Sequence, residues 1–479
     1  MSTENGKTTR REFIQGSVAA AAGVAAVGAM PTTADAMKRV IGANDRIHIG
    51  HIGVGTQGYT AHVRLINQFA KENNTEQIAA CDLYGRRIRR AQKELSLKDS
   101  QVFGDYKKLL ANKDIDAVVI ASSDNWHAPL TIAAMEAGKH VYCEKPMCKT
   151  LEEAFAVYDT CKKTKRIFQV GSQGTSDPKY AAVAKIIKSG KLGHMVVAQG
   201  DYMRGDNKVG EWNNTGDLEW DLDAGPNASG DAHIDWETFR RGVGPAAWDP
   251  DRFFRWRKYW DYGSGLVGDL FPHKLHPLFI AMGLPTEGMA GWPLRVSSGG
   301  GLYVQKTRKD PVSGKEVLDR QVPDFINLNV DFDDCSLMAM ASTINEEGWP
   351  QSIRCQKGTV LFSGSTIKVK PERSYADELD GSEEQAPGEG EPIPGHHKNW
   401  FESIRANTAP NGNIDLAVRV QVMLTLAERS YRESRTFLFD PKTRTASAAG
   451  GPAPTDPLAN KPVHKLTIHT VKPSGIARR

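Results

Sequence analysis

Asp269 and His273 form a candidate acid–base pair, because they lie four residues apart in the chain. In a helix, this spacing places two side chains on one face and within reach of each other. A carboxylate beside a histidine can fix its tautomer and stabilise its charged form. We therefore predict that His273 takes a proton from a hydroxyl group and that Asp269 orients it. A pair at this spacing, taken by itself, is more often structural.

Lys145 is a second candidate, because it follows the short apolar segment His140–Cys143 and precedes Pro146. We interpret the segment as a strand, so the ammonium group would stand at the end of a sheet strand. A cation in this position can polarise a hydroxyl or carbonyl oxygen. The alternative is a surface lysine that pairs with Glu144.

Gly53, Gly55 and Gly58 follow the strand-like segment Arg46–Ile52 and precede a helical pattern that begins near Tyr59. This G-x-G-x-x-G context is typical of a dinucleotide-binding turn. Its glycines allow a tight turn, close approach of a pyrophosphate, and close packing of helix against strand. The N–H groups at the start of the helix are free to bind the phosphates.

Asp82 ends the next apolar segment, Gln77–Cys81, somewhat more than about 20 residues after the glycines. An acidic residue here fits hydrogen bonding to ribose hydroxyls and would repel a 2′-phosphate, so the sequence favours NAD over NADP. Arg86 and Arg87 follow closely and would weaken that preference if they faced the cofactor. We interpret both as solvated helix residues.

Strand and helix patterns alternate through residues 40–170, which predicts a doubly wound parallel sheet in an α/β domain. Ligands bind such sheets at the carboxyl ends of the strands, so the polar residues there are candidate cofactor contacts. The predicted contacts are Gly53, Gly55, Thr56, Gln57, Gly58, Asp82, Ser122, Asn125, His127, Glu144 and Lys145.

Residues 171–479 have a different pattern and are predicted to form a second, α+β domain. Strands are expected at Met195–Tyr202, Phe325–Phe332, Ser336–Thr343, Gln351–Gln356 and Gly358–Phe362. The segment Phe253–Asp269 is rich in aromatic residues, which suit the C–H faces of sugars, and in arginines, which suit carboxylates or phosphates. An ordinary packed loop is the alternative. The candidate substrate contacts are Arg204, Arg257, Tyr259, Trp260 and His276.

The composition excludes several classes of protein. With 40% hydrophobic and 25% charged residues, the chain is neither wholly disordered nor a collagen nor a multi-span membrane protein. A net charge of +4 gives no reason to propose nucleic acid as a partner. The six cysteines lack paired spacing and are interpreted as buried thiols. Asp269, His273 and His276 lack an evident fourth ligand, so we predict no metal site.

Residues 1–36 are interpreted as an export signal. They contain the twin arginines Arg10 and Arg11, the apolar run Gly16–Met30, and a small-x-small cleavage site at Ala34–Ala36. We expect export by the twin-arginine machinery to the periplasm or the cell exterior. An uncleaved helix or a disordered leader is the alternative. No later stretch of 18 or more apolar residues exists, so no membrane span is expected.

The sequence resembles the Gfo/Idh/MocA oxidoreductases, named for glucose–fructose oxidoreductase and inositol dehydrogenase. The resemblance is carried by GVGTQG, by DAVVIASSDNWHAPLTIAAMEAGKHVYCEKP and by Asp269-x-x-x-His273. It implies a Rossmann domain followed by a large open-faced, mostly antiparallel sheet. One face of that sheet would cover the substrate, and the other usually makes a homo-oligomer interface. In this family the lysine that matches Lys145 bonds the reacting sugar oxygen beside the nicotinamide. Ser123-Asp124 departs from the family's usual Thr-Pro, and His276 from its aspartate.

The resemblance implies an NAD(P)-dependent oxidoreductase that acts on CH–OH groups of a sugar, polyol or glycoside, with tightly bound cofactor. The alternative is a glycoside hydrolase of the family 109 type. Such an enzyme oxidises the sugar transiently, eliminates the aglycone, adds water and returns the hydride. Family 109 sequences typically vary the Glu-Lys-Pro that this chain keeps at residues 144–146. A non-catalytic sugar-binding protein is a third hypothesis, disfavoured by the joint presence of Lys145, Asp269 and His273.

Overall fold

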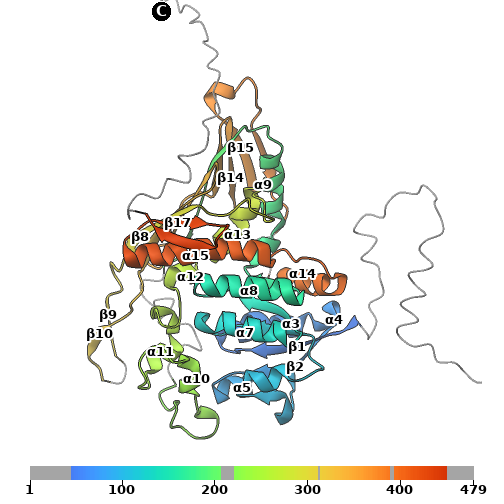
Figure 1. Ribbon diagram of the computed structural model, residues 1–479, viewed down its shortest axis with the longest axis vertical. Coiled ribbons are helices and arrows are strands. Elements are labelled where there is room, and N and C mark those ends of the chain that lie inside the picture. Colours follow the sequence, from blue (N-terminus) through green and yellow to red (C-terminus); the bar gives the residue numbers. More distant parts are fainter. Residues whose placement is uncertain (1–44, 206–220, 311–312, 389–392, 450–479) are drawn as a thin grey trace, which may run out of the picture. The chain divides into compact units, whose positions relative to one another are not determined.

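The computed structural model describes residues 45–205, 221–310, 313–388 and 393–449 (Figure 1). The predicted export signal lies outside these residues. Two sheets organise the described chain, a parallel sheet in its N-terminal part and a larger mixed sheet after it. None of the described helices is long and apolar enough to cross a bilayer.

The N-terminal sheet has six parallel strands in the order β3-β2-β1-β4-β5-β6, which confirms the predicted doubly wound domain. Its strands are mostly buried, which explains their nearly continuous apolar sequence. The order reverses between β1 and β4, and ligands bind open α/β sheets at such a point. The strands are β1 (Ile47–Ile52), β2 (Thr75–Cys81), β3 (Val102–Phe103), β4 (Ala117–Ile120), β5 (His140–Glu144) and β6 (Phe168–Gly171).

Helix α7 begins at Asp124 and contains Pro129 in its second turn. A proline inside a helix lacks the N–H that would bond the carbonyl four residues earlier. The carbonyl oxygen of Asn125 therefore needs another donor. It accepts a hydrogen bond from Nη1 of Arg241, which lies in the second part of the chain. The helices of this part are η2 (Gly58–Val63), α3 (Arg64–Gln68), α4 (Ala70–Asn73), α5 (Gly85–Leu95), α6 (Tyr106–Leu110), α7 (Asp124–Glu136) and α8 (Leu151–Thr164).

The second sheet has ten strands in the order β16-β15-β14-β13-β7-β12-β11-β8-β17-β18. Its neighbours pair antiparallel except β7 and β12, so the predicted large, mostly antiparallel sheet is confirmed. The strands are β7 (Met195–Met203), β8 (Arg295–Gly301), β11 (Phe325–Asp331), β12 (Ser336–Ser342), β13 (Ser352–Cys355), β14 (Gly358–Ser363), β15 (Thr366–Pro371), β16 (Ser382–Gln385), β17 (Phe437–Asp440) and β18 (Thr445–Ala448).

Two C-terminal helices connect the parts of the chain. Helix α15 (Ile414–Glu433) packs against both β8 and α8, so its residues are buried around most of its circumference. Helix α14 (Ile393–Ala406) brings Trp400 and Phe401 into a buried cluster with Ile47 of β1. Helix α14, which comes late in the sequence, thus completes the core around the parallel sheet (Figure 1).

The remaining helices and a small hairpin lie around the candidate site and along the large sheet. The helices are α9 (Pro178–Lys188), α10 (Trp236–Arg240), α11 (Pro250–Phe254), α12 (Gly265–Asp269) and α13 (Pro272–Ala281), with the short turns η3 (Asp99–Gln101), η4 (Gln173–Ser176), η6 (Gly230–Ala232), η7 (Trp256–Lys258) and η8 (Arg373–Tyr375). The hairpin consists of β9 (Thr307–Lys309) and β10 (Glu316–Leu318).

Candidate active site

A cavity of about 950 Å³ lies at the carboxyl ends of the parallel strands and has walls from both parts of the chain. It brings together most of the predicted site residues, although they are far apart in the sequence. The predicted residues on its wall are Gly53, Gly55, Thr56, Gln57, Asp82, Ser122, His127, Glu144, Lys145, Arg204, Arg257, Asp269 and His273.

The glycine turn has the geometry that the sequence predicts. Gly53 has a φ of +84°, and a Cβ atom there would lie 2.6 Å from the carbonyl oxygen of Ala121. Gly58 is not on the cavity wall, because it packs beneath the turn. A Cβ atom on Gly58 would lie 2.1 Å from the carbonyl oxygen of Gly53. Gly58 thus allows close packing of helix and strand rather than contact with a ligand.

The residues around this turn fit a dinucleotide. Thr56 lines the cavity at this turn, and none of the described residues bonds its hydroxyl group. The Asp82 carboxylate accepts the amide of Val54 at 2.8 Å and that of Tyr84 at 3.1 Å. These bonds hold the carboxylate beside the turn and leave further lone pairs for ribose hydroxyls.

Arg87 lines the cavity, so its interpretation as a solvated residue is wrong. Its guanidinium lies 5.0 Å from the Phe253 ring centre and 5.7 Å from that of Tyr84. These aromatic faces attract the cation and draw it over the turn. Arg86 points elsewhere and pairs with Asp223 at the surface.

Lys145, Asp269 and Arg257 form an ion cluster that also lines the cavity. Nζ of Lys145 lies 2.8 Å from Oδ1 of Asp269 and 2.8 Å from its carbonyl oxygen. Nε of Arg257 lies 3.1 Å from the same Oδ1. Burial alone would raise the pKa of the Asp269 carboxyl, but the charges of Lys145 and Arg257 outweigh it and hold the pKa well below its ordinary value.

Asp269 and His273 do not share one helical turn, so that part of the prediction is wrong. Helix α12 ends at Asp269 and α13 begins at Pro272, which cannot donate a helical hydrogen bond. His273 lines the cavity with its ring 5.2 Å from that of Tyr202. The Asp269 carboxylate forms ion pairs with Lys145 and Arg257. Its role as the residue that orients His273 remains a prediction.

Four other predicted contacts, Asn125, Tyr259, Trp260 and His276, do not line the cavity. The Asn125 side chain accepts a hydrogen bond from the Ser123 hydroxyl at 2.7 Å behind the wall. The Tyr259 hydroxyl bonds the buried Asp251. Trp260 donates its indole N–H to the Gln321 carbonyl at 3.1 Å. His276 is buried, with Nδ1 3.0 Å from the Pro272 carbonyl oxygen.

Sequence reasoning missed Asp124 as a wall residue. Its carboxyl accepts the Ser264 amide at 3.0 Å. Burial, helped by the charge of Asp269 and opposed by that of Arg257, raises the pKa of Asp124 to about 7. The only signal in the sequence was the departure of Ser123-Asp124 from the family pattern.

A buried chain of histidines supports Glu144, and sequence analysis did not foresee it. Nε2 of His62 lies 2.8 Å from Oε1 of Glu144, and Nδ1 of His62 lies 2.9 Å from Nε2 of His397 on α14. Burial tends to raise the pKa of Glu144. The contacts with His62 and the charge of Lys145 outweigh it and lower the pKa to about 2. Glu144 is therefore a fixed carboxylate beside the cavity.

His127 lies on the wall and is held by backbone oxygens. Its Nδ1 lies 2.6 Å from the Pro146 carbonyl oxygen and its Nε2 3.2 Å from that of Ser122. Burial lowers the pKa of His127, while its contacts with the two carbonyl oxygens and the charge of Glu144 act in the opposite direction. All six cysteines are buried, as expected. Among the described residues, no group of three histidines, cysteines or carboxylates could hold a metal ion.

The six-stranded parallel sheet, with its glycine turn at the edge of the cavity, is a Rossmann fold of the dinucleotide-binding type. Residues 47–172 match a family model described as "Oxidoreductase family, NAD-binding Rossmann fold". This model is that of the Gfo/Idh/MocA family, and its match covers the N-terminal domain, while the solved structures show that the fold of the described chain is shared more widely.

Two curated relatives and one solved structure illustrate the similarity. A glycosyl hydrolase family 109 protein of Shewanella baltica is 29% identical over 252 residues, which cover 49% of this chain and 51% of that protein. An alpha-N-acetylgalactosaminidase of Shewanella oneidensis is 27% identical over 203 residues, which cover 41% of each chain. The chain thus matches about half the length of these relatives. A levoglucosan dehydrogenase in complex with NADH and levoglucosan has a TM-score of 0.59, with 18% identity over 85% of this chain and 100% of that one.

Proposed function

We propose that the protein is an NAD(P)-dependent oxidoreductase that acts on a CH–OH group of a sugar, polyol or glycoside. The observation that carries this proposal is the shared cavity. It joins the glycine turn at Gly53 and Gly55 with the Lys145–Asp269–Arg257 cluster and with His273. A substrate between the two walls would meet both a cofactor and an acid–base group.

In this proposal the glycine turn, Thr56 and Asp82 hold the dinucleotide, which supplies hydride transfer when bound. Lys145 donates a hydrogen bond to the substrate oxygen and stabilises the negative charge that develops on it. His273 accepts the hydroxyl proton. Asp269 positions the Lys145 ammonium through a bond of 2.8 Å. The aromatic residues Tyr202 and Trp256 also line the cavity, and aromatic faces suit the C–H faces of a sugar.

A second candidate is hydrolysis or elimination of a glycoside by transient oxidation of the sugar. Sequence similarity to family 109 proteins favours it, although that similarity covers only half of each relative. Such a reaction would use the same residues for oxidation. It would also need an acid for the leaving group, and Asp124 and His273 are the wall residues that could serve.

One experiment separates the two candidates. The purified protein is incubated with a panel of free sugars and polyols and, separately, with aryl glycosides, while NADH absorbance and aglycone release are recorded together. Net NADH formation or NADH-dependent reduction supports the oxidoreductase. Aglycone release without net NADH change supports the glycosidase. Lys145→Met serves as the inactive control. If this variant kept both the NADH signal and aglycone release at the wild-type level, both proposals would be overturned.

We also propose export by the twin-arginine route to the periplasm or the cell exterior, on the basis of Arg10, Arg11 and the apolar run that follows. Replacement of both arginines by lysine should keep the protein in the cytoplasmic fraction. Self-association as a homo-oligomer is a further proposal from the family resemblance. Light scattering of the purified protein would test it.

A further inference from the structure

Asp124 is a second carboxyl group on the wall of the cavity, beside the ion cluster of Lys145 and Asp269. It is the first residue of α7, and only 4% of it is exposed. A Cβ atom on Gly268 would lie 3.2 Å from Oδ2 of Asp124 and 3.1 Å from Cγ of Pro146. Asp124 therefore lies close to the chain neighbours of Lys145 and Asp269, and two carboxyl groups occupy one part of the site.

The two carboxyl groups have unequal partners. Oδ1 of Asp269 accepts Nζ of Lys145 at 2.8 Å and Nε of Arg257 at 3.1 Å. Among the described residues, only the Ser264 amide bonds the Asp124 side chain, at 3.0 Å from Oδ2. Two buried carboxylates that lie close together repel each other, so the one without a cation tends to hold a proton. Asp269 is thus the carboxylate of this part of the site, and Asp124 is its acid.

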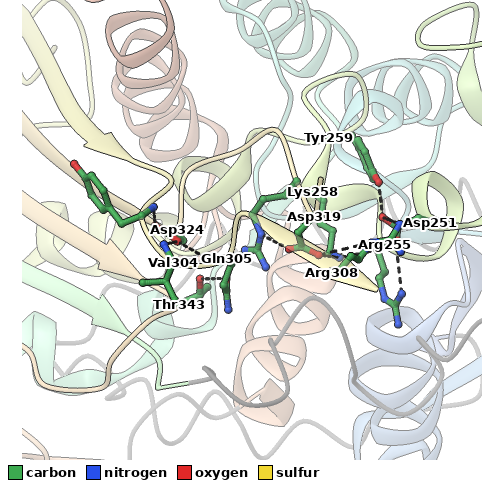
Figure 2. Close-up of polar contacts among 12 residues, drawn as sticks. Asp251, Arg255, Lys258, Tyr259, Val304, Gln305, Arg308, Asp319, Asp324 and Thr343 are labelled. Carbon is green, nitrogen blue, oxygen red and sulfur yellow. Dashed lines mark hydrogen bonds and ion pairs between the residues drawn. The ribbon is translucent and has the colours of Figure 1, made fainter. Parts of the chain in front are cut away.

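The segment that carries Arg257 is fixed in place by a buried ion network (Figure 2). Nζ of Lys258, the next residue, lies 2.6 Å from Oδ1 of Asp319, and both side chains are at most 1% exposed. The Lys258 carbonyl oxygen accepts the amide of Gln321 at 2.9 Å. Because breaking a buried ion pair is strongly destabilising, the turn η7 keeps its position. Arg257 therefore stays beside Asp269 and does not neutralise the second carboxyl group.

Burial has the largest effect on the Asp124 carboxyl and raises its pKa to about 7. The charge of Asp269 raises this pKa as well, whereas the charges of Arg257 and Lys149 and the bond from the Ser264 amide lower it. Burial also raises the pKa of the two thiols that interact with Asp124, so both stay uncharged. These thiols belong to Cys143 and Cys148. Asp124 thus holds its proton below about pH 7 and loses it above.

The acid form and the ionised form of Asp124 would act on a substrate in opposite ways. The acid has an O–H group that can donate a hydrogen bond to a substrate oxygen. The carboxylate has no donor. Its charge would also compete for the Lys145 ammonium and oppose the negative charge that develops on the reacting oxygen. A site in which one carboxyl group is ionised and its neighbour is protonated can divide the acid and base roles between them.

We propose that Asp124, in its acid form, is a catalytic residue that donates a hydrogen bond to an oxygen atom of the substrate. The inference rests on the proposed function, because it presumes that a hydroxylated substrate occupies the cavity. It adds a proton donor to a wall on which Lys145 supplies the cation and His273 accepts the hydroxyl proton. The reaction should therefore slow as the pH rises and Asp124 loses its proton.

Asp124→Asn tests the proposal, because its side chain cannot ionise. The amide oxygen can accept the Ser264 amide as the carboxyl does, which leaves an N–H donor for the substrate. With NAD and the sugar or polyol that the wild type oxidises fastest, the wild-type kcat/KM should fall above about pH 7. The variant should match the wild type at about pH 6 and exceed it at least about tenfold at about pH 9. Asp440→Asn is the matched control, because Asp440 is exposed, does not line the cavity, and likewise accepts a backbone amide, that of Lys442 at 2.8 Å.

Asp124→Leu has a similar shape but no donor, so its kcat/KM at about pH 6 should be about fivefold to tenfold below that of Asp124→Asn. Equal rates of the two variants would overturn the donor role.

Infrared spectra test the protonation state without cofactor or substrate. The difference between wild type and Asp124→Asn should contain the C=O stretch of a protonated carboxyl group at about pH 6 and lose it by about pH 9. Absence of this band, or identical pH profiles of wild type and Asp124→Asn, would overturn the assignment even if Asp124→Leu does not fold. A wild type that shows the band but oxidises no sugar or polyol would instead overturn the proposed function, and the donor role with it.

Discussion

Nζ of Lys145 and Oδ1 of Asp269 lie 2.8 Å apart, although 124 residues separate them in the chain. Their side chains are 9% and 14% exposed, so the ion pair is largely shielded from water. The contact joins the end of β5 to the end of α12 and thereby fixes one part of the chain against the other at the cavity. The spacing in the sequence pairs this carboxylate with His273, and the structure shows that it also binds the lysine.

Asp269→Asn should destabilise the fold, because it leaves Lys145 and Arg257 partly buried without their carboxylate. We expect a loss of about 3 kcal/mol in the free energy of unfolding at neutral pH, measured by denaturant titration. The Asp269 pKa is depressed in the fold, so its stabilisation is present above the ordinary Asp pKa of about 3.9 and disappears as the pH falls below it. A difference from wild type that stayed constant into this acid range would contradict the assignment.

Lys145→Met should lower the turnover rate without emptying the cofactor site. The substitution keeps the length of the side chain but removes the cation that stabilises charge on the substrate oxygen, so we expect a loss of at least about a hundredfold in kcat. Nucleotide content, measured by mass spectrometry of the desalted protein, should stay at the wild-type level. A variant that lost both activity and nucleotide would show that Lys145 serves binding rather than chemistry.

The strands and the glycine turn were predictable from sequence because they depend on local patterns. The apolar runs before Gly53, Asp82 and Lys145 are buried strands whose ends must meet at one sheet edge. The Lys145–Asp269 pair was not predictable, since no periodic pattern connects residues on different elements. Strand β8 was also missed, because its sequence RVSSGGG offers glycine and serine where a strand usually shows branched or aromatic side chains.

The predicted substrate contacts fall into two groups, those that line the cavity (Arg204 and Arg257) and those that do not (Tyr259, Trp260 and His276). Arg257 reaches the cavity, whereas its neighbour Lys258 turns into the buried ion network around Asp319. Consecutive residues in a short helical turn point in different directions, so composition identified the right segment but could not select the side chains within it. The same limit accounts for Tyr259 and Trp260, which support the segment without lining the cavity.

As the pH falls, His62→Leu should lose NAD affinity at a higher pH than the wild type does. His62 helps to keep the pKa of Glu144 at about 2, against burial that favours the protonated acid. Without this partner, Glu144 should take up a proton closer to or above its ordinary pKa of about 4.3, with loss of a fixed charge beside the cavity. NAD binding measured across acid pH checks this, and His194→Gln is the control because His194 is exposed. Identical pH profiles for wild type and His62→Leu would refute it.

Asp124→Asn should stabilise the protein at alkaline pH. The pKa of Asp124 rises to about 7 in the fold, so the folded state holds a proton that the unfolded chain loses near pH 4. Stability from this group is therefore full below the unfolded pKa and declines as the pH rises to about 7. Asparagine mimics the protonated acid and can still accept the Ser264 amide. We expect a gain of up to roughly 4 kcal/mol above pH 7 that vanishes near pH 4, measured by denaturant titration at both pH values. A gain that was equal at both pH values would assign the effect to packing rather than to the buried charge.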